Sequence, residues 1–143
     1  MFWDSSAVVP LAFQEPRSTE LNGLLDAESR FTLWWATSIE CAAAGYRGHR
    51  ERRIDAATLK TGLAIVHELA AEAQIVAPTD AVRARAEVLL ARHALRAADA
   101  LQLAAALAWC EDQPWNESFV SLDTRLRAAA AHEGFTVVPA DST

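Results

Sequence analysis

The sequence predicts an α/β fold, in which a small, mainly parallel sheet of about five short strands is flanked by helices. Short apolar runs alternate along the chain with longer segments whose apolar residues recur at helical spacing, which is the pattern of strand–helix units. Strands covered by helices on both faces are apolar throughout, as these runs are. With 143 residues, 52% of them hydrophobic and 22% charged, the chain is expected to form one domain over residues 1–143.

The first elements along the chain are expected to be a strand, two helices and a second strand. Residues 1–4 form a short apolar run. Ser5 or Ser6 can cap the helix that follows, because a serine hydroxyl accepts a hydrogen bond from a free backbone N–H of the first turn. Pro16 is well placed to open the next helix. The aromatic and β-branched run at 31–35 predicts a strand.

Two helices and a short strand are expected next. Thr37, with Glu40 three residues later, has the spacing of a capping box and predicts a helix that continues through Ala44. Asp55 can cap a longer helix whose apolar residues lie on one stripe. The short apolar run at 75–77 predicts a brief strand.

The rest of the chain continues the alternation of helices and strands. The expected elements are two helices, a strand, a helix and a final strand, at about 80–89, 97–110, 118–122, 123–133 and 135–138. Thr79 or Asp80 begins the first of these helices, and Gly134 can end the last. Because strands alternate with helices, the sheet is expected to be mainly parallel.

Four acidic residues lie where a strand is expected to end or a helix to begin: Asp4, Glu40, Asp99 and Asp123. Each of them alone can be explained as a helix cap or as a favourable charge near a helix start. In an open parallel sheet, however, ligands bind beyond the carboxyl ends of the strands, and this edge would collect all four acids. Carboxylates clustered in this way repel one another unless a cation lies among them. Hard oxygen ligands favour Mg²⁺ or Mn²⁺.

Other kinds of site lack their signatures in this sequence. The four histidines are scattered without an H-x-x-x-H pair, so a zinc site is not expected. The sequence contains no phosphate-binding loop, dinucleotide-binding glycine motif or nucleophile elbow. The net charge of −6 argues against nucleic-acid binding driven by overall charge.

The basic residues are nearly all arginine, twelve in number beside the single Lys60. Four of them fall at Arg47, Arg50, Arg52 and Arg53. The guanidinium group suits bidentate contact with phosphate, but a solvated helix end and loop is the favoured explanation of this cluster.

No segment is apolar enough to predict a membrane span, and the first residues, MFWDSS, lack the features of a secretory signal. Cys41 and Cys110 are expected to be small buried thiols rather than a disulfide. We therefore expect a soluble, cytoplasmic protein.

Four segments of the chain together resemble the PIN-domain ribonucleases, and more closely the VapC toxins of bacterial toxin–antitoxin pairs. These segments are FWDSSAVVPL, TSIECAAA, LRAADALQLAAAL and FVSLDTRLRAAAAHEGFTVV. The resemblance covers almost the whole chain and implies a PIN-like α/β/α sandwich. It assigns catalytic and metal-binding roles to Asp4, Glu40, Asp99 and Asp123. It also assigns a catalytic role to Ser121, which stands in place of the family's usual threonine and can still offer a hydroxyl. Mg²⁺ is the implied cofactor, with Mn²⁺ as an alternative.

The resemblance also implies cleavage of RNA, a homodimer, and inhibition by a VapB-type antitoxin. Gln102 stands where the family often has histidine, which removes one possible contact to substrate or metal. In the leading hypothesis Asp4, Glu40 and Asp99 hold the principal metal, Asp123 completes this site or helps a second metal, and a metal-activated water attacks the phosphorus.

Two alternatives stay open from the sequence. One is a catalytically inactive PIN-like module that binds RNA or protein and uses its acids as helix caps. The other is a metal-dependent phosphatase or DNA nuclease, although an aspartyl-phosphate enzyme would show a D-x-D pair where this chain reads Asp4-Ser5-Ser6. Candidate contacts to RNA are the arginines at 47–53 and, if they lie nearer the cleft, Arg17, Arg96 and Arg125.

Overall fold

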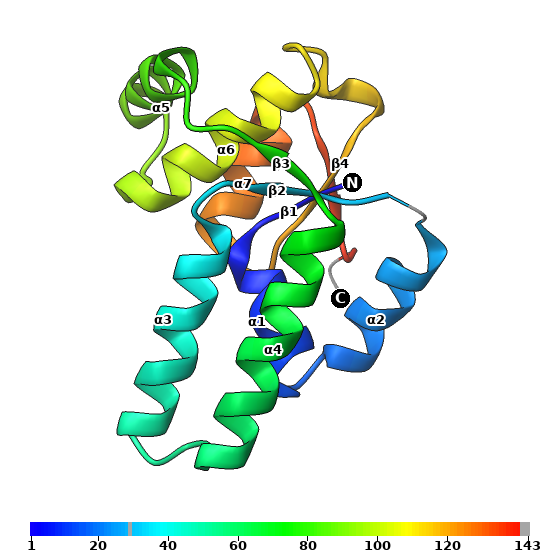
Figure 1. Ribbon diagram of the computed structural model, residues 1–143. Coiled ribbons are helices and arrows are strands. Elements are labelled where there is room, and N and C mark those ends of the chain that lie inside the picture. Colours follow the sequence, from blue (N-terminus) through cyan, green and yellow to red (C-terminus); the bar gives the residue numbers. More distant parts are fainter. Residues whose placement is uncertain (29, 141–143) are drawn as a thin grey trace.

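Five short parallel strands form the centre of the computed structural model, which describes residues 1–28 and 30–140 (Figure 1). In sheet order the strands are β3 (Gln74–Val76), β2 (Thr32–Trp34), β1 (Phe2–Trp3), β4 (Ser118–Val120) and β5 (Thr136–Val138). All four neighbouring pairs are parallel. The small, mainly parallel sheet predicted from the sequence is confirmed. Strand β3 lies one residue earlier than expected, and the other four strands are slightly shorter than expected.

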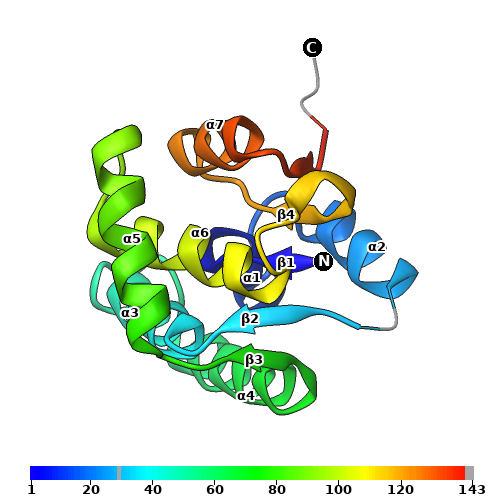
Figure 2. The same cartoon turned by 90° about the horizontal axis from the view of Figure 1, so that it is seen from above.

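Helices cover both faces of this sheet (Figures 1 and 2). One face carries α1 (Ser5–Phe13), α2 (Ser18–Ala27), α3 (Thr37–Arg50) and α4 (Ala56–Glu72). The other face carries α5 (Asp80–Arg92), α6 (Ala97–Trp109) and α7 (Thr124–Glu133). A short 3₁₀ helix, η1 (Pro114–Asn116), precedes β4. The predicted PIN-like α/β/α sandwich is confirmed.

The strands are apolar because each face of the sheet packs against its own layer of helices. Successive side chains of a strand point to opposite faces. Phe2 accordingly packs with α5, α6 and α7, whereas its neighbour Trp3 packs with α1 and α4. The rings of Phe2 and Phe119 stack with centroids 5.5 Å apart, which joins β1 to β4 within the first of these cores.

The order of the strands reverses at β1. From β1 the chain proceeds outward to β2 and β3, and it later returns to place β4 and β5 on the other side of β1. The carboxyl ends of β1 and β4 therefore flank the topological switch point, which is where open α/β sheets bind their ligands. The backbone N–H of Asp4 donates to the carbonyl of Val120 at 3.0 Å, so these two ends are directly joined.

Several helix starts differ from the prediction. Asp4, and neither Ser5 nor Ser6, caps α1, because its carboxylate accepts the backbone N–H of Ser6. The capping box of Thr37 and Glu40 is absent: the cap of α3 is Ala36, and it makes no side-chain hydrogen bond.

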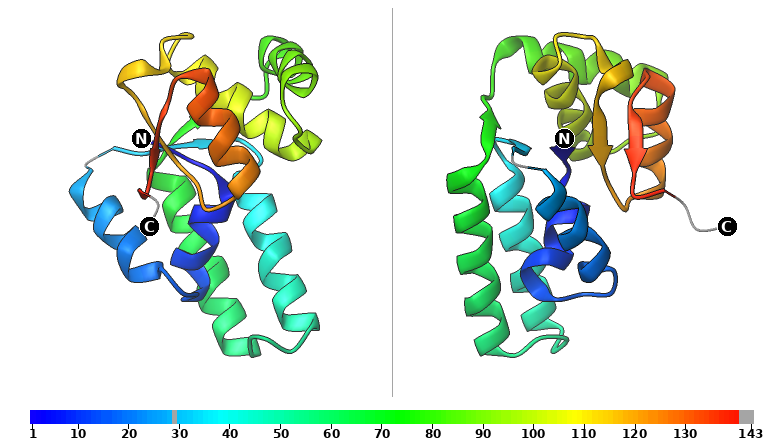
Figure 3. Two further views of the ribbon diagram at one scale, coloured as in Figure 1. Left: turned by 180° about the vertical axis from the view of Figure 1, so that it is seen from behind. Right: turned by 90° about the vertical axis from the view of Figure 1, so that its right-hand side faces the viewer.

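Two helix boundaries also differ. The second helix begins at Ser18, and Pro16 lies before it. Helix α3 continues to Arg50, well beyond Ala44. Together with α4 it forms a long antiparallel pair that projects from the sheet (Figure 3).

The other predicted caps are confirmed. Asp55 accepts the backbone N–H of Thr58 at 2.7 Å at the start of α4, and Thr79 accepts that of Val82 at 3.2 Å at the start of α5. Gly134 ends α7 with a φ of 113°, a conformation that other residues rarely adopt.

Both cysteines are free thiols, as expected. Cys41 is buried, and this burial, together with the nearby charges of Glu40 and Asp4, raises the pKa of its thiol to about 12. Cys110 is only partly buried. Within the described residues, no helix is both long and apolar enough to cross a membrane.

Candidate metal and nucleic-acid site

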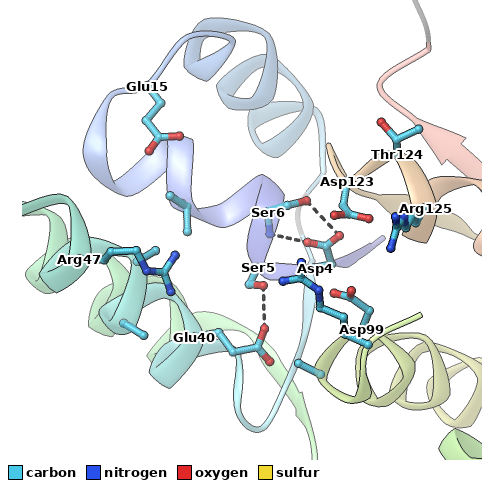
Figure 4. Close-up of a pocket in the computed structure, with 15 residues that line it drawn as sticks. Asp4, Ser5, Ser6, Glu15, Glu40, Arg47, Asp99, Asp123, Thr124 and Arg125 are labelled. Atoms are coloured by element: carbon cyan, nitrogen blue, oxygen red, sulfur yellow. Dashed lines mark hydrogen bonds between the residues drawn. The ribbon is translucent and has the colours of Figure 1, made fainter. Parts of the chain in front are cut away.

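A pocket of about 810 Å³ opens at the carboxyl edge of the sheet and extends along α1 and α3. The four acids predicted from the sequence, Asp4, Glu40, Asp99 and Asp123, all line it. They come from four separate elements, and the topology of the sheet brings these elements to one place (Figure 4). The structure thus places the four predicted acids in a single pocket.

Asp4 lies at the bottom of this pocket and is 1% exposed. Its carboxylate accepts hydrogen bonds from the backbone N–H of Ser6 and, at 3.0 Å, from the Ser6 hydroxyl. Burial raises the pKa of Asp4 from 3.8 to about 7, and the charge of Asp123 acts in the same direction, against the hydrogen bonds from Ser121 and Ser6. A cation beside Asp4 would favour its ionised form.

Ser121 lies behind the pocket and is fully buried. Its hydroxyl is 3.3 Å from that of Ser6 and accepts the backbone N–H of Asp123 at 3.1 Å. The Ser6 hydroxyl also accepts the backbone N–H of Leu122 at 2.9 Å. Ser121, predicted as a site residue, is therefore placed to hold Asp4 and Asp123 in position rather than to line the pocket.

Glu40 projects from the first turn of α3 and accepts a hydrogen bond from the Ser5 hydroxyl at 2.8 Å. The amide nitrogen of Gln102 donates to both of its carboxylate oxygens at 3.3 Å and to the Thr37 hydroxyl at 3.0 Å. Burial raises the pKa of Glu40, the charge of Asp99 adds to the rise, and these hydrogen bonds oppose it. Gln102 is thus a support of Glu40, a role that the sequence did not reveal.

Asp99 and Asp123 stand at the starts of two helices on the opposite face. Burial raises the pKa of Asp99, the charge of Asp123 adds to this, and the charge of Arg96 opposes it. Asp123 caps α7, because its Oδ1 accepts the backbone N–H of Leu126 at 2.8 Å. Within residues 1–28 and 30–140 its second oxygen makes no such bond, so capping and ligand binding are compatible at this residue.

The carboxylates of Asp4, Asp99 and Asp123 point toward a common space, whereas Glu40 approaches from α3 on the far side of Ser5 (Figure 4). The arrangement is open: within the described residues, no three of these acids bring carboxylate oxygens within 4.8 Å of one another. Mg²⁺ usually keeps several of its waters and takes only one or two carboxylates directly. The donor set therefore fits a hydrated Mg²⁺ or Mn²⁺ ion better than it fits a dehydrated one.

Three of the candidate arginines, Arg47, Arg96 and Arg125, also line the pocket. In the part of the chain that the structure describes, none of the three forms an ion pair. Their guanidinium groups add positive charge around the acids. The pocket can therefore receive both a cation and the phosphates that accompany it.

The remaining candidate arginines lie elsewhere. Arg17 lines a different, smaller pocket and pairs with Glu20 at 3.0 Å. Arg50, Arg52 and Arg53 do not line the acid pocket. They lie where α3 ends and the loop to α4 begins, which agrees with the alternative of a solvated helix end.

Glu15 is a fifth acid of the pocket that the sequence did not single out. It follows α1 in a loop and belongs to no motif. The sequence indicates Ser5 and Ser6 only as helix caps, yet both line the pocket and hold its acids. The pattern Asp4-Ser5-Ser6 directly after a strand was the available signal for them.

Neither a family model nor a curated protein matches the sequence. Among solved structures, the fold is similar to that of a chain in a toxin–antitoxin complex from Klebsiella pneumoniae, with a TM-score of 0.59. The two chains share 19% identity, and the match covers 89% of each. This likeness establishes a common fold over nearly the whole chain.

Proposed function

We propose that this protein is a Mg²⁺- or Mn²⁺-dependent endoribonuclease of the PIN type and the toxin of a type II toxin–antitoxin pair. The observation that carries the proposal is the convergence of four carboxylates on one pocket at the switch point of the sheet. Burial raises the pKa of Asp4, Glu40 and Asp99, so these groups are poorly stabilised as anions without a counter-charge. A divalent cation would supply that charge.

In this proposal Asp4, Glu40 and Asp99 hold the principal ion, directly or through water. Asp123 completes the site or helps to hold a second ion near the start of α7. When bound, the metal supplies a water of lowered pKa and stabilises charge on the scissile phosphate. Ser6 and Ser121 keep Asp4 and Asp123 at fixed positions through the hydrogen bonds described above.

Local positive charge supports a polyanionic substrate. Arg47, Arg96 and Arg125 line the same pocket as the acids and are suited to phosphate contact. Because the net charge is −6, binding of a nucleic acid would depend on these few side chains and on the metal rather than on overall charge. The choice of RNA over DNA rests on the sequence resemblance.

The proposed partner is a VapB-type antitoxin. The solved structure of similar fold is a toxin–antitoxin complex, which supports a partner of this kind. An acidic pocket attracts a basic side chain of a binding partner, and such a side chain would block the site. Trp35, Ile39 and Tyr46 are exposed apolar residues at the start of α3 and along it, which leaves apolar surface for an antitoxin or for a second copy in the proposed homodimer.

The alternative is a catalytically inactive PIN-like module whose acids are only helix caps. Asp4 and Asp123 do cap α1 and α7. Glu40 and Asp99, however, cap no helix, although both line the pocket and have raised pKa values. The observations therefore favour the metal-dependent enzyme.

Cleavage of RNA by Asp4→Asn and Asp99→Asn variants tests the proposal. We expect Mg²⁺-dependent cleavage to fall by about a hundredfold or more in each, because each loses an anionic ligand. Asp55→Asn is the matched control, since Asp55 is a helix cap outside the pocket and should leave cleavage unchanged. Cleavage and growth arrest that both survive in Asp4→Asn would show the assignment to be wrong. RNA binding by a wild-type protein that does not cleave would favour the inactive module.

The toxin role has its own test. Expression of the wild-type chain is expected to arrest growth, and co-expression of a small DNA-binding protein encoded just upstream is expected to restore it. Growth that is unaffected by an active enzyme would contradict the toxin role and leave the nuclease proposal intact.

A further inference from the structure

The ends of α5 and α7 bring together three side chains that the proposed nuclease site does not use. They are His93, which follows the last residue of α5, and the consecutive pair His132 and Glu133 at the end of α7. One potential ligand atom of each lies within 4.8 Å of the other two. Both helices lie on the α6 face of the sheet (Figure 2). The histidines look scattered in the sequence, and the fold makes two of them neighbours.

The three groups already contact one another. His93 Nε2 lies 2.7 Å from Glu133 Oε2, and the rings of His93 and His132 meet edge to face with centroids 5.4 Å apart. The side chains of His93 and Glu133 are only 10% and 7% exposed. His132 is exposed, so an ion could reach the cluster from solvent on its side.

The cluster offers both nitrogen and oxygen ligand atoms. Glu133 supplies a carboxylate, and His93 and His132 each supply an imidazole ring. Neutral imidazole offers a free nitrogen lone pair to a metal. Two imidazoles and one carboxylate make a donor set that suits Zn²⁺ and similar transition-metal ions, whereas Mg²⁺ prefers oxygen alone.

The spacing of these groups also suits such an ion. Bonds of about 2.0–2.1 Å at tetrahedral angles place neighbouring ligand atoms about 3.3 Å apart. His93 Nε2 and Glu133 Oε2 are closer than this, at 2.7 Å, and all three ligand atoms lie within 4.8 Å of one another. Small side-chain rotations therefore suffice to bring the three atoms to the spacing that the ion requires. Arg92 contacts both oxygens of Glu133, Oε1 at 3.1 Å and Oε2 at 3.4 Å, and so orients the carboxylate.

We propose that His93, His132 and Glu133 form a binding site for Zn²⁺ or a similar transition-metal ion, with water completing the coordination. This site is separate from the acid pocket, because Asp123 and His132 lie at opposite ends of α7, roughly 14 Å apart along the helix axis. A bound ion joins the end of α5 to the end of α7 and thereby stabilises the folded chain. The inference does not depend on the proposed nuclease activity.

Calorimetric titration with ZnCl₂ tests this site, with protein that has been stripped of transition metals and is kept in saturating Mg²⁺. We expect the wild type to bind Zn²⁺ and the His132→Ala variant to bind it at least tenfold more weakly. His67→Ala is the matched control, because His67 is also an exposed helical histidine but lies on α4. This variant should bind Zn²⁺ as tightly as the wild type does. Glu133→Gln should weaken binding as His132→Ala does.

Thermal unfolding gives a second, independent measurement. Zn²⁺ is expected to raise the melting temperature of the wild type and of His67→Ala, and to leave that of His132→Ala nearly unchanged. His132 makes no hydrogen bond in the described part of the chain, so its replacement should preserve the fold. A wild type that binds no Zn²⁺, or an affinity that is unchanged in His132→Ala, would overturn the proposal.

Discussion

The hydroxyl oxygen of Ser6 lies 3.3 Å from that of Ser121, and this contact joins the start of α1 to the segment that follows β4. The Ser6 hydroxyl also contacts Asp4 at 3.0 Å, and the Ser121 hydroxyl accepts the backbone N–H of Asp123 at 3.1 Å. Asp4 and Asp123 therefore belong to one hydrogen-bonded unit across the switch point of the sheet. A change at one of them is expected to affect the other.

The stability of the metal-free protein should fall as the pH rises from about 4 to about 7. The pKa of Asp4 is 3.8 in the unfolded reference and about 7 in the folded chain. In this window the folded state holds a proton that the unfolded chain has released, so raising the pH favours unfolding, by up to about 4 kcal/mol in total. Urea unfolding at a series of pH values in the presence of EDTA measures this.

The Asp4→Asn variant is the control for that measurement, because asparagine does not titrate. The free energy of unfolding of this variant should depend less on pH than that of the wild type. Some dependence should remain, because the pKa values of Glu40 and Asp99 are also raised. Mg²⁺ should stabilise the wild type more at pH 8 than at pH 5, since it binds the ionised carboxylates. Equal slopes for the two proteins between pH 4 and pH 7 would show that Asp4 has no raised pKa.

Asp123 offers a way to separate helix capping from metal binding. Asparagine caps a helix about as well as aspartate does, so Asp123→Asn should change the free energy of unfolding by less than about 1 kcal/mol. Cleavage of RNA should nevertheless fall, because the negative charge is lost. Asp123→Ala should lose activity and a further ~1 kcal/mol of stability.

The same two substitutions at Asp55, the cap of α4 outside the pocket, provide the matched comparison. They should reproduce the effects on stability without any effect on cleavage. If Asp123→Asn kept full activity, Asp123 would be a cap only.

Gln102 is expected to control the position of Glu40. Gln102→Met keeps a similar volume but removes the donor to Glu40 and to Thr37, so the free energy of unfolding should fall by about 1–3 kcal/mol. The Mg²⁺ concentration for half-maximal cleavage should rise, because Glu40 is less well oriented. Cleavage rates measured against Mg²⁺ concentration test this. A loss of stability with an unchanged Mg²⁺ requirement would make Gln102 a purely structural residue.

Arg47 and Arg50 form a natural pair for testing contact with RNA. Both belong to the last turns of α3, but only Arg47 lines the pocket. Arg47→Ala should weaken RNA binding and reduce the slope of log affinity against log salt concentration by about 0.7, the value for one lost phosphate contact to a single strand. Arg50→Ala should have a smaller effect on both. Equal effects of the two substitutions would place the RNA elsewhere.

The sequence predicted the fold because the signals for it are local. Runs such as 118–122 are short and apolar, and caps such as Asp55 and Thr79 act through hydrogen bonds three residues away. Four of the five strands end one or two residues before the predicted position, because apolar character continues past the last paired residue. Leu122, for example, packs partly buried against the core after β4 has ended.

The capping box at Thr37 failed because a non-local interaction prevailed over a local one. Glu40 has the correct spacing from Thr37, but its carboxylate is bound by Ser5 from α1 and by Gln102 from α6. These partners are 35 and 62 positions away in the sequence, so no local pattern could indicate them.

The same limit explains the other omissions. The pairing of His93 with Glu133 is visible only once α5 and α7 are packed on one face of the sheet. The four acids could be predicted because the rule for parallel sheets relates their local positions, at strand ends and helix starts, to one shared edge.

The most direct test of the central claim is the binding of Mn²⁺ to the acid pocket, followed by electron paramagnetic resonance. The measurement is best made in a His132→Ala background, so that the second proposed metal site does not contribute. We predict that this protein binds Mn²⁺, that excess Mg²⁺ displaces it, and that a further Asp4→Asn and Asp99→Asn substitution weakens binding at least tenfold. Mn²⁺ affinity that is unchanged by those two substitutions would contradict the account, because the acids would then not be a metal site.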